Sequence, residues 1–160
     1  NPHFLFNNMS VLSSLVYKDQ DKAVDFINQL GKVYRYLLDT RSSELVSLSD
    51  ELVFIKSYTY LLGIRFDKNL DFEMDIAAGQ ENKLLPPMAL QILVENAIKH
   101  NEISTESPLH IRIRTINDRL EVGNNLQLRS DLEPSFKTGL KNIRDLALGG
   151  EVAVTPLKGG

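Results

Sequence analysis

Apolar and polar residues alternate along this 160-residue chain with two different periods. Over residues 2 to about 18 and about 21 to 38, apolar side chains recur every three or four positions, which predicts two amphipathic helices. The polar residues 18–21 between them suit a tight turn, so the two segments should form a helical hairpin. The apolar face of the second segment is wide, and two helices cannot shield such faces from water by themselves. We therefore expect two copies of the chain to pair into a four-helix bundle.

The first helix begins at Pro2, which is tolerated in a first turn because its missing N–H would be unpaired there anyway. His3 follows, and helical spacing from His3 leads to the polar residues Asn7, Ser10 and Ser14. We therefore expect His3 to face water. The separate apolar stripe of this helix comprises Leu5, Met9, Leu12 and Val16.

After a polar linker at residues 39–44, the spacing of apolar residues switches between the helical period and the two-residue period of strands. Capping residues at 47–51 and the pair Pro86-Pro87 each introduce a helix, and Asn117-Asp118 suits the turn of a hairpin. The predicted helices are 49–64, 88–100 and 140–148, and the predicted strands are 69–76, 109–114, 120–124 and 151–155. This order predicts an α+β fold, in which the helical hairpin is followed by an α/β sandwich with a mostly antiparallel sheet.

Composition narrows the class of protein without indicating a function. Hydrophobic residues make up 42% and charged residues 24%, as in ordinary globular proteins. The net charge of -3 and the lack of a long basic run argue against direct nucleic-acid binding. The absence of Cys excludes disulfides and thiolate metal sites, and no spacing of residues suggests a hydrolase triad or a zinc site. Since the chain begins at Asn1 without a signal peptide or long apolar run, we expect a cytoplasmic piece of a longer protein, with any membrane anchor upstream.

Polar residues interrupt the apolar helix predicted at 88–100. Asn96 offers a neutral oxygen ligand that suits Mg²⁺, and Lys99, on the same face, can reach a phosphate. The two residues could therefore hold a metal–nucleotide. Taken alone, however, an Asn and a Lys at this spacing more often belong to a solvated helix end.

Two stretches together resemble the LytS/YehU-type sensor histidine kinases. The dimerisation helix of that family opens with N-P-H-F-L-F-N, as residues 1–7 do, and its ATPase domain carries L-V-E-N-A-I-K-H, as residues 93–100 do. Further matches lie at Arg35-Tyr36, Tyr60 to Phe66, Pro86-Pro87 and Gly139 to Arg144. The resemblance implies a homodimerisation hairpin at 1–42 and a GHKL (Bergerat-fold) ATP-binding domain at 43–160. It also implies transfer of a phosphoryl group from Mg²⁺-ATP to His3 and then to an aspartate of a response regulator, as in the cytoplasmic part of an inner-membrane sensor.

The resemblance also assigns roles to individual residues. It makes His3 the phosphoacceptor and Asn96 the Mg²⁺ ligand, and it places Lys99 and His100 near the phosphates. Where many kinases have an acid directly after the histidine, this chain has Phe4, so Asn7 is the nearest polar group on the same face that could orient the imidazole. Glu95 is next to Asn96 in sequence, so its carboxylate is the obvious one near the nucleotide and a candidate base.

Two boxes of the family pattern depart from the usual residues. In the family, the aspartate of D-x-G-x-G binds the adenine amino group, and the aligned residues 122–126 of this chain contain no aspartate. Asn124 or Asn125 could accept that hydrogen bond through an amide oxygen. The glycine box G-x-G-L-x-N retains only Gly139 and Leu140 of its first four residues, and the lid between the two boxes is short.

These departures leave an alternative open, namely a degenerate, non-catalytic module that dimerises through its hairpin and signals by contact. A GHKL ATPase of the chaperone or repair type is a weaker alternative, because such enzymes need no phosphoacceptor helix. His110 lies in a predicted strand and is assigned no chemistry.

Overall fold

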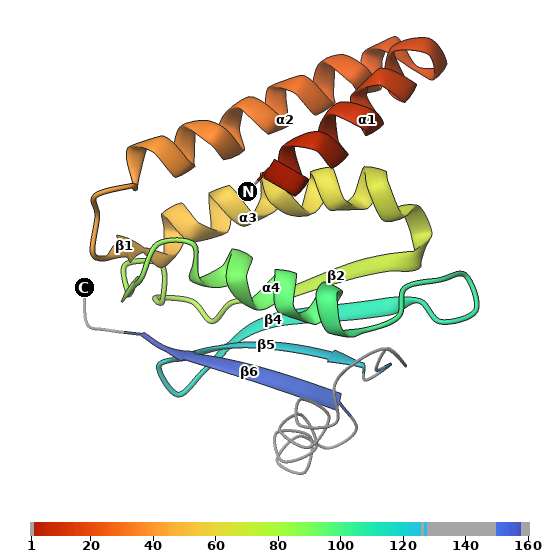
Figure 1. Cartoon of the computed structure of the whole chain (residues 1–160). Coiled ribbons are helices and arrows are strands. Elements are labelled where there is room, and N and C mark those ends of the chain that lie inside the picture. Colours follow the sequence, from red (N-terminus) through yellow and green to blue (C-terminus); the bar gives the residue numbers. More distant parts are fainter. Residues whose placement is uncertain (1, 126, 128–149, 158–160) are drawn as a thin grey trace.

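A computed structural model of the chain describes residues 2–125, 127 and 150–157. The predicted helical hairpin is confirmed: α1 (Pro2–Lys18) and α2 (Gln20–Asp39) lie against each other (Figure 1). Asp19 is the single residue between the two helices, and its carboxylate accepts a hydrogen bond from the Lys22 N–H at 3.1 Å. Such an N-cap satisfies one of the amides that every helix start leaves unpaired, so the polar residues fix where α2 begins.

The remaining elements follow the predicted order. They are β1 (Val46–Ser47), α3 (Leu48–Phe66), a 3-10 helix (Asp67–Asn69), β2 (Leu70–Asp75), β3 (Leu84–Leu85), α4 (Ala89–His100), β4 (Leu109–Ile116), β5 (Arg119–Asn125) and β6 (Gly150–Pro156). The short strands β1 and β3 pair with each other, and alternation over two residues is too brief to predict them. The helix predicted at 140–148 lies outside the described residues.

The main sheet has the strand order β2-β4-β5-β6. β2 runs parallel to β4, whereas the β4–β5 and β5–β6 pairs are antiparallel, so the sheet is mostly antiparallel as expected. The β4–β5 hairpin closes through Asn117 and Asp118, whose φ angles are 48° and 56°. Positive φ at both central residues defines the turn type that best matches the twist of paired strands, and Asn and Asp tolerate it. The predicted turn is therefore confirmed.

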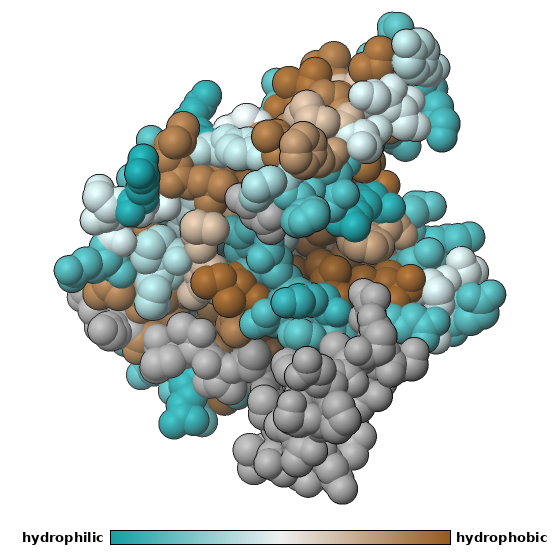
Figure 2. Space-filling view, viewed as in Figure 1, coloured by the Kyte–Doolittle hydropathy of each residue, from teal (hydrophilic) through white to brown (hydrophobic). Residues whose placement is uncertain are grey.

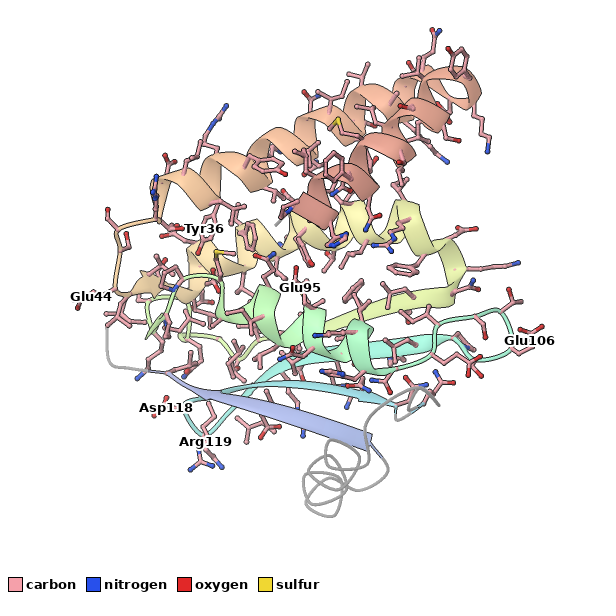
Figure 3. All side chains as sticks on the ribbon, in the orientation of Figure 1. Tyr36, Glu44, Glu95, Glu106, Asp118 and Arg119 are labelled. Atoms are coloured by element: carbon pink, nitrogen blue, oxygen red, sulfur yellow. The ribbon has the colours of Figure 1, made fainter. Side chains whose placement is uncertain are left out.

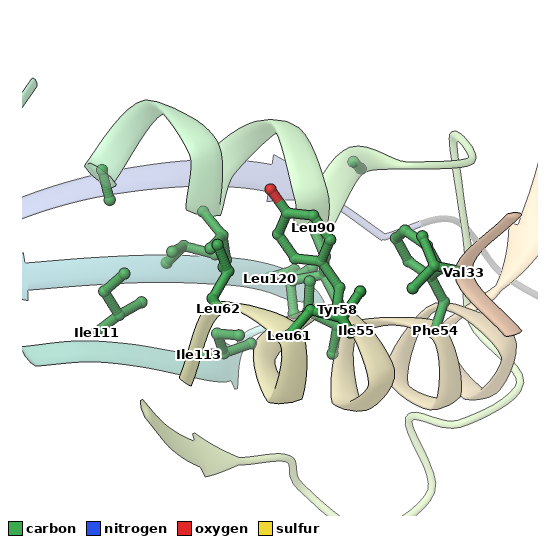
Figure 4. Close-up of a cluster of buried hydrophobic side chains, with 14 of the residues drawn as sticks. Val33, Phe54, Ile55, Tyr58, Leu61, Leu62, Leu90, Ile111, Ile113 and Leu120 are labelled. Atoms are coloured by element: carbon green, nitrogen blue, oxygen red, sulfur yellow. The ribbon is translucent and has the colours of Figure 1, made fainter. Parts of the chain in front are cut away.

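The elements form layers (Figure 1): α3 and α4 cover one face of the sheet, and the hairpin stacks on α3. One core joins all of them. Figure 4 shows Ile111, Ile113 and Leu120 of the sheet gathered with Tyr58 and Leu61 of α3 and Leu90 of α4, while Val33 of α2 lies to one side of the cluster. The α+β order predicted from the sequence is thereby confirmed. Among the described residues, no helix has both the length and the apolar character required to cross a membrane.

The predicted apolar stripe of α1 is only partly used inside the chain. Phe4, Val11 and Leu15 pack against the core together with Leu12, and Asn8 is buried beside them. Leu5, Met9 and Val16 are instead 39%, 39% and 44% exposed. The hairpin buries one face of α1 on α2 and α3, and the stripe lies largely on another face, which a single chain leaves in contact with water.

Candidate functional site

The start of α1 is held on α3 while His3 stays exposed, as predicted. The next residue, Phe4, turns inward and stacks on Tyr58 of α3, with ring centroids 5.6 Å apart and an interplanar angle of 25°. It also approaches Tyr34 of α2, at 6.3 Å between centroids. Asn7, one turn after His3, is exposed as well. Phe4 therefore anchors the helix start on α3, while His3 beside it is exposed.

The polar residues predicted on α4 lie on an exposed face of the helix, and this face is wider than expected. Asn96 and Lys99 are exposed, as is Ile92, which is 53% exposed. Leu90 and Val94 on the opposite side are fully buried against α3 and the sheet. In the view of Figure 1, α4 lies between α3 and the strands β4 and β5 and contacts both, while the face with Asn96 and Lys99 stays exposed. The residues proposed for Mg²⁺ and phosphate thus share the open face of α4.

Glu95 points from α4 toward α3 (Figure 3). Its Oε1 accepts hydrogen bonds from the Tyr58 hydroxyl at 3.0 Å and from Nε2 of Gln91 at 3.1 Å. Burial, together with the Glu95 charge, raises the pKa of Tyr58, so the phenol stays protonated and donates. The Glu95 carboxylate is therefore engaged in holding α4 on α3, and its role as a base stays a prediction.

Asn124 and Asn125 lie at the end of β5 and face opposite sides of the sheet. Asn124 is buried on the side of Leu120 and Val122, which the helices cover. Within the described residues its amide oxygen makes no hydrogen bond, while its Nδ2 donates to the carbonyl oxygen of Asn125 at 2.8 Å. Asn125 is exposed, and both ends of its amide are bonded to the chain at 108–110. The geometry therefore favours Asn124 over Asn125 as the residue available to a ligand.

Asn101 was not singled out by the sequence reasoning, yet it ties the end of α4 to the segment after β5. The side chain is buried, its Nδ2 donates to the carbonyl oxygen of Ala97 at 2.8 Å, and its Oδ1 accepts from the Gln127 N–H at 2.8 Å. An Asn directly after a helix is a stop signal that could have identified it. Gly139 and Leu140 lie outside the described residues.

His110 lies on the exposed face of the sheet, where it contacts Asp71 at 2.8 Å and Glu73 at 3.5 Å. Arg112 contacts Glu73 on the same face at 3.1 Å. These charges form a surface network, and the neighbouring Arg112 and His110 lower the pKa of Glu73 through their hydrogen bonds. Within the described residues, no group of three or more His, Cys, Asp or Glu side chains could hold a metal ion.

Comparison with known proteins connects these observations to a family. Residues 1–70, which include His3 and the whole hairpin, match the histidine kinase family model. The chain belongs to the histidine kinase family. It is 39% identical over 100 residues to the sensor protein LytS of Staphylococcus saprophyticus, a match that covers 62% of this chain and 17% of that protein.

Two further relatives are also named as sensor kinases. An uncharacterised sensor-like histidine kinase of Staphylococcus epidermidis is 38% identical over 121 residues, and the sensor protein kinase HptS of Staphylococcus aureus is 33% identical over 121 residues. Each of these two matches covers 76% of this chain but only 23% of the relative. The chain thus spans roughly a fifth of the length of the curated relatives it matches.

His100, at the end of α4, should titrate at lower pH than an ordinary histidine. Burial, reinforced by the positive charge of Lys99, lowers its pKa from 6.5. Because the unfolded chain binds this proton more readily, the contribution of His100 to stability is present above pH 6.5 and is lost as the pH falls through the lowered pKa.

An NMR titration of the His100 ring should therefore give a midpoint below 6.5. In Lys99→Gln, the midpoint should move upward, since one of the two causes is removed. A midpoint at or above 6.5 in the unsubstituted chain would contradict this assignment.

Proposed function

We propose that this chain is the dimeric core of a sensor histidine kinase in a two-component system. Residues 1–42 form the dimerisation and phosphotransfer hairpin, and residues 43–160 form an ATP-binding domain with the GHKL sandwich. The core transfers a phosphoryl group from ATP to His3 and then to an aspartate of a response regulator. It works on the cytoplasmic side of a membrane-anchored sensor. Family membership and the placement of the site residues support this function.

The observation that carries the proposal is a chain of contacts between the two motifs. Phe4, which follows His3, stacks on Tyr58, and Tyr58 donates to Glu95, which precedes Asn96. His3 and Asn96 are 93 residues apart in sequence, yet the residues beside them are both anchored to one tyrosine of α3. A phosphoryl donor and its acceptor must be positioned with respect to each other, and positioning accounts for much of the rate of phosphoryl transfer.

The exposed face of α4 fits a metal–nucleotide. Asn96 would hold Mg²⁺ through its amide oxygen, since Mg²⁺ prefers hard oxygen ligands and usually shares its shell with phosphates and water. Lys99 and His100 would contact the phosphates, Lys99 as a charge and His100 as a neutral hydrogen-bonding group. When bound, Mg²⁺-ATP supplies the phosphoryl group and neutralises its charge. Asn124 would accept from the adenine amino group. Its buried position at the end of β5, with no hydrogen bond to its amide oxygen from any other described residue, supports that role.

His3 would act as the nucleophile through a neutral imidazole nitrogen. A neutral imidazole already carries a lone pair that can attack phosphorus, so His3 needs orientation more than activation. The Phe4 anchor supplies part of that orientation by fixing the backbone. Asn7, one turn further along α1, would fix the ring tautomer by a hydrogen bond, and its exposed position on the same helix supports this role.

The hairpin would pair with a second copy through its exposed apolar side chains. Figure 2 shows hydrophobic side chains over the hairpin at the top of the molecule. The exposed apolar side chains include Leu5, Phe6, Met9 and Val16 of α1 and Val24 and Ile27 of α2. Contiguous exposed apolar residues on a soluble protein mark an interaction surface, and two such hairpins make a four-helix bundle.

Ile27→Asp should therefore convert the dimer to a monomer. Ile27 is 51% exposed, so the folded chain tolerates Asp there, whereas an interface would have to bury an unpaired charge. We expect the dimer dissociation constant, measured by analytical ultracentrifugation, to rise by at least about a hundredfold. Ile116→Asp, on the sheet, should leave the dimer intact. A dimer of unchanged affinity in Ile27→Asp would exclude this surface as the interface.

Incubation with γ-labelled ATP and Mg²⁺ tests the function. The proposal expects an acid-labile, alkali-stable label on the chain. The degenerate-module alternative is favoured by the departures at Asn124-Asn125 and Lys137-Thr138, and it predicts no label and millimolar or absent nucleotide binding. Micromolar binding that depends on Mg²⁺ would exclude that alternative.

A further inference from the structure

The first turn of α4 has no N-cap of its own. The residue at the N-cap position is Met88, in the left-handed region with φ 66° and ψ 11°, and its side chain cannot accept a hydrogen bond from the following amides. Helix starts leave four N–H groups unpaired, and most helices satisfy some of them with Ser, Thr, Asp or Asn. The start of α4 therefore depends on acceptors from elsewhere in the fold.

Glu51 of α3 supplies these acceptors. Its Oε2 accepts a hydrogen bond from the Met88 N–H at 3.1 Å, and its Oε1 accepts one from the Leu90 N–H at 3.2 Å. Glu51 is 0% exposed, which is rare for a carboxylate. Burial raises its pKa above 4.5, whereas the hydrogen bonds lower it. A negative charge at a helix N-terminus is favoured by the helix dipole, so Glu51 caps α4 from the neighbouring helix.

A third helix joins at the same carboxylate. The hydroxyl of Tyr36, near the end of α2, donates a hydrogen bond to Oε2 of Glu51. The Tyr36 ring is stacked on Phe54 of α3, with centroids 4.4 Å apart and an interplanar angle of 19°. Figure 3 shows Tyr36 between α2 and α3. Burial and the adjacent Glu51 charge raise the pKa of Tyr36, so its hydroxyl remains a donor.

The three hydrogen bonds depend on one another. A buried carboxylate is stable only when donors surround it, and removing one donor weakens its hold on the others. The Tyr36 hydroxyl is the donor on α2, so its position changes if the hairpin moves relative to α3. Such a movement therefore reaches the first turn of α4 through Glu51, and α4 carries the open face with Asn96 and Lys99.

We propose that Glu51 is a positioning residue for α4 and that the Tyr36 hydroxyl couples the hairpin to the start of this helix. Displacement of α2 from α3 breaks the Tyr36–Glu51 bond, loosens the first turn of α4 and lowers its affinity for nucleotide. The effect on nucleotide rests on the proposed function. The coupling between the three helices does not, because it exists without any ligand.

Hydrogen exchange in the full chain without nucleotide tests the coupling. The variant Tyr36→Phe keeps the ring and removes only the hydroxyl. We expect the amides of Met88 and Leu90 to exchange about tenfold faster than in the unsubstituted chain, while amides in the middle of the β4–β5 ladder stay unchanged. Tyr60→Phe is the matched control, because among the described residues the Tyr60 hydroxyl bonds no carboxylate, and it should leave α4 unchanged. Unchanged exchange at Met88 and Leu90 in Tyr36→Phe, or uniformly faster exchange over β4 and β5, would overturn the proposal.

A double substitution separates coupling from general loosening. In a Glu51→Gln background the Tyr36→Phe effect on these amides should largely disappear, since the group that transmits it has changed. If the two effects add, Tyr36 does not act through Glu51. A titration with Mg²⁺-ATP gives a second readout: Tyr36→Phe should weaken binding several-fold. If the unsubstituted chain binds no nucleotide, the proposed function fails while the exchange result still decides the coupling.

Discussion

Asn96→Ala is expected to weaken the binding of Mg²⁺-ATP by at least about tenfold, the lower end of the loss seen when metal-site partners are removed. The reason is chemical: the alanine offers no oxygen to the metal, while Lys99 still attracts the phosphates. Binding in the absence of Mg²⁺ should change little. Because Asn96 is exposed, its replacement should leave the free energy of unfolding within about 0.5 kcal/mol of the original.

Asn82→Ala is a suitable control for this titration, because Asn82 is also exposed but lies in the loop before β3. It should bind Mg²⁺-ATP as the unsubstituted chain does. Calorimetry with and without Mg²⁺ measures both variants. Equal affinities for Asn96→Ala and the unsubstituted chain, with Mg²⁺ present, would remove Asn96 from the site.

His3→Gln is expected to abolish phosphorylation while the affinity for nucleotide stays unchanged. Glutamine keeps a polar side chain but has no nitrogen that can carry the phosphoryl group. His3 is exposed at the start of α1, and the Phe4 anchor that fixes this start is retained. A loss of label without a loss of binding would therefore mark His3 as the acceptor and not as a structural residue.

His110→Gln is the matched control for this substitution. His110 is an exposed histidine on the sheet, in contact with Asp71 and Glu73, and the account gives it no part in the transfer. The control should be labelled at the same rate as the unsubstituted chain. Labelling that persists in His3→Gln, or is lost in His110→Gln, would contradict the assignment.

The elements could be predicted from the sequence because their patterns are local. The helical period of α2, the alternation of β2 and the positive-φ residues Asn117 and Asp118 each determine structure within a few positions. The exposure of His3 followed from the same reasoning. The two-residue strands β1 and β3 could not be predicted, since pairing at such short length is imposed by the surrounding fold.

The contacts that hold the candidate site together were harder to predict. Glu51 meets Tyr36 and the first turn of α4, and Tyr58 meets Glu95, only because three helices pack together. The bonded partners are 15, 37 and 39 residues apart in sequence. One signal was present: Glu51 lies three residues after Leu48 and four before Ile55, on the apolar side of α3. A carboxylate on an apolar stripe must find donors, so it indicates a buried network without naming the members.

The choice between Asn124 and Asn125 shows the same limit. Either residue was predicted to stand in for the family aspartate, and only the register of β5 on β4 shows which of them lies on the covered side of the sheet. A shift of one residue would exchange their roles. The sequence therefore left two candidates at this position, and the strand register was needed to show which of them is buried.

Mapping the phosphorylated residue tests whether His3 accepts the phosphoryl group. The chain is incubated with Mg²⁺-ATP, kept at neutral or alkaline pH and fragmented in a mass spectrometer under conditions that preserve phosphohistidine. We expect one phosphoryl group per chain, on His3. A chain that binds Mg²⁺-ATP and carries no phosphoryl group, or carries it on a residue other than His3, would contradict the account.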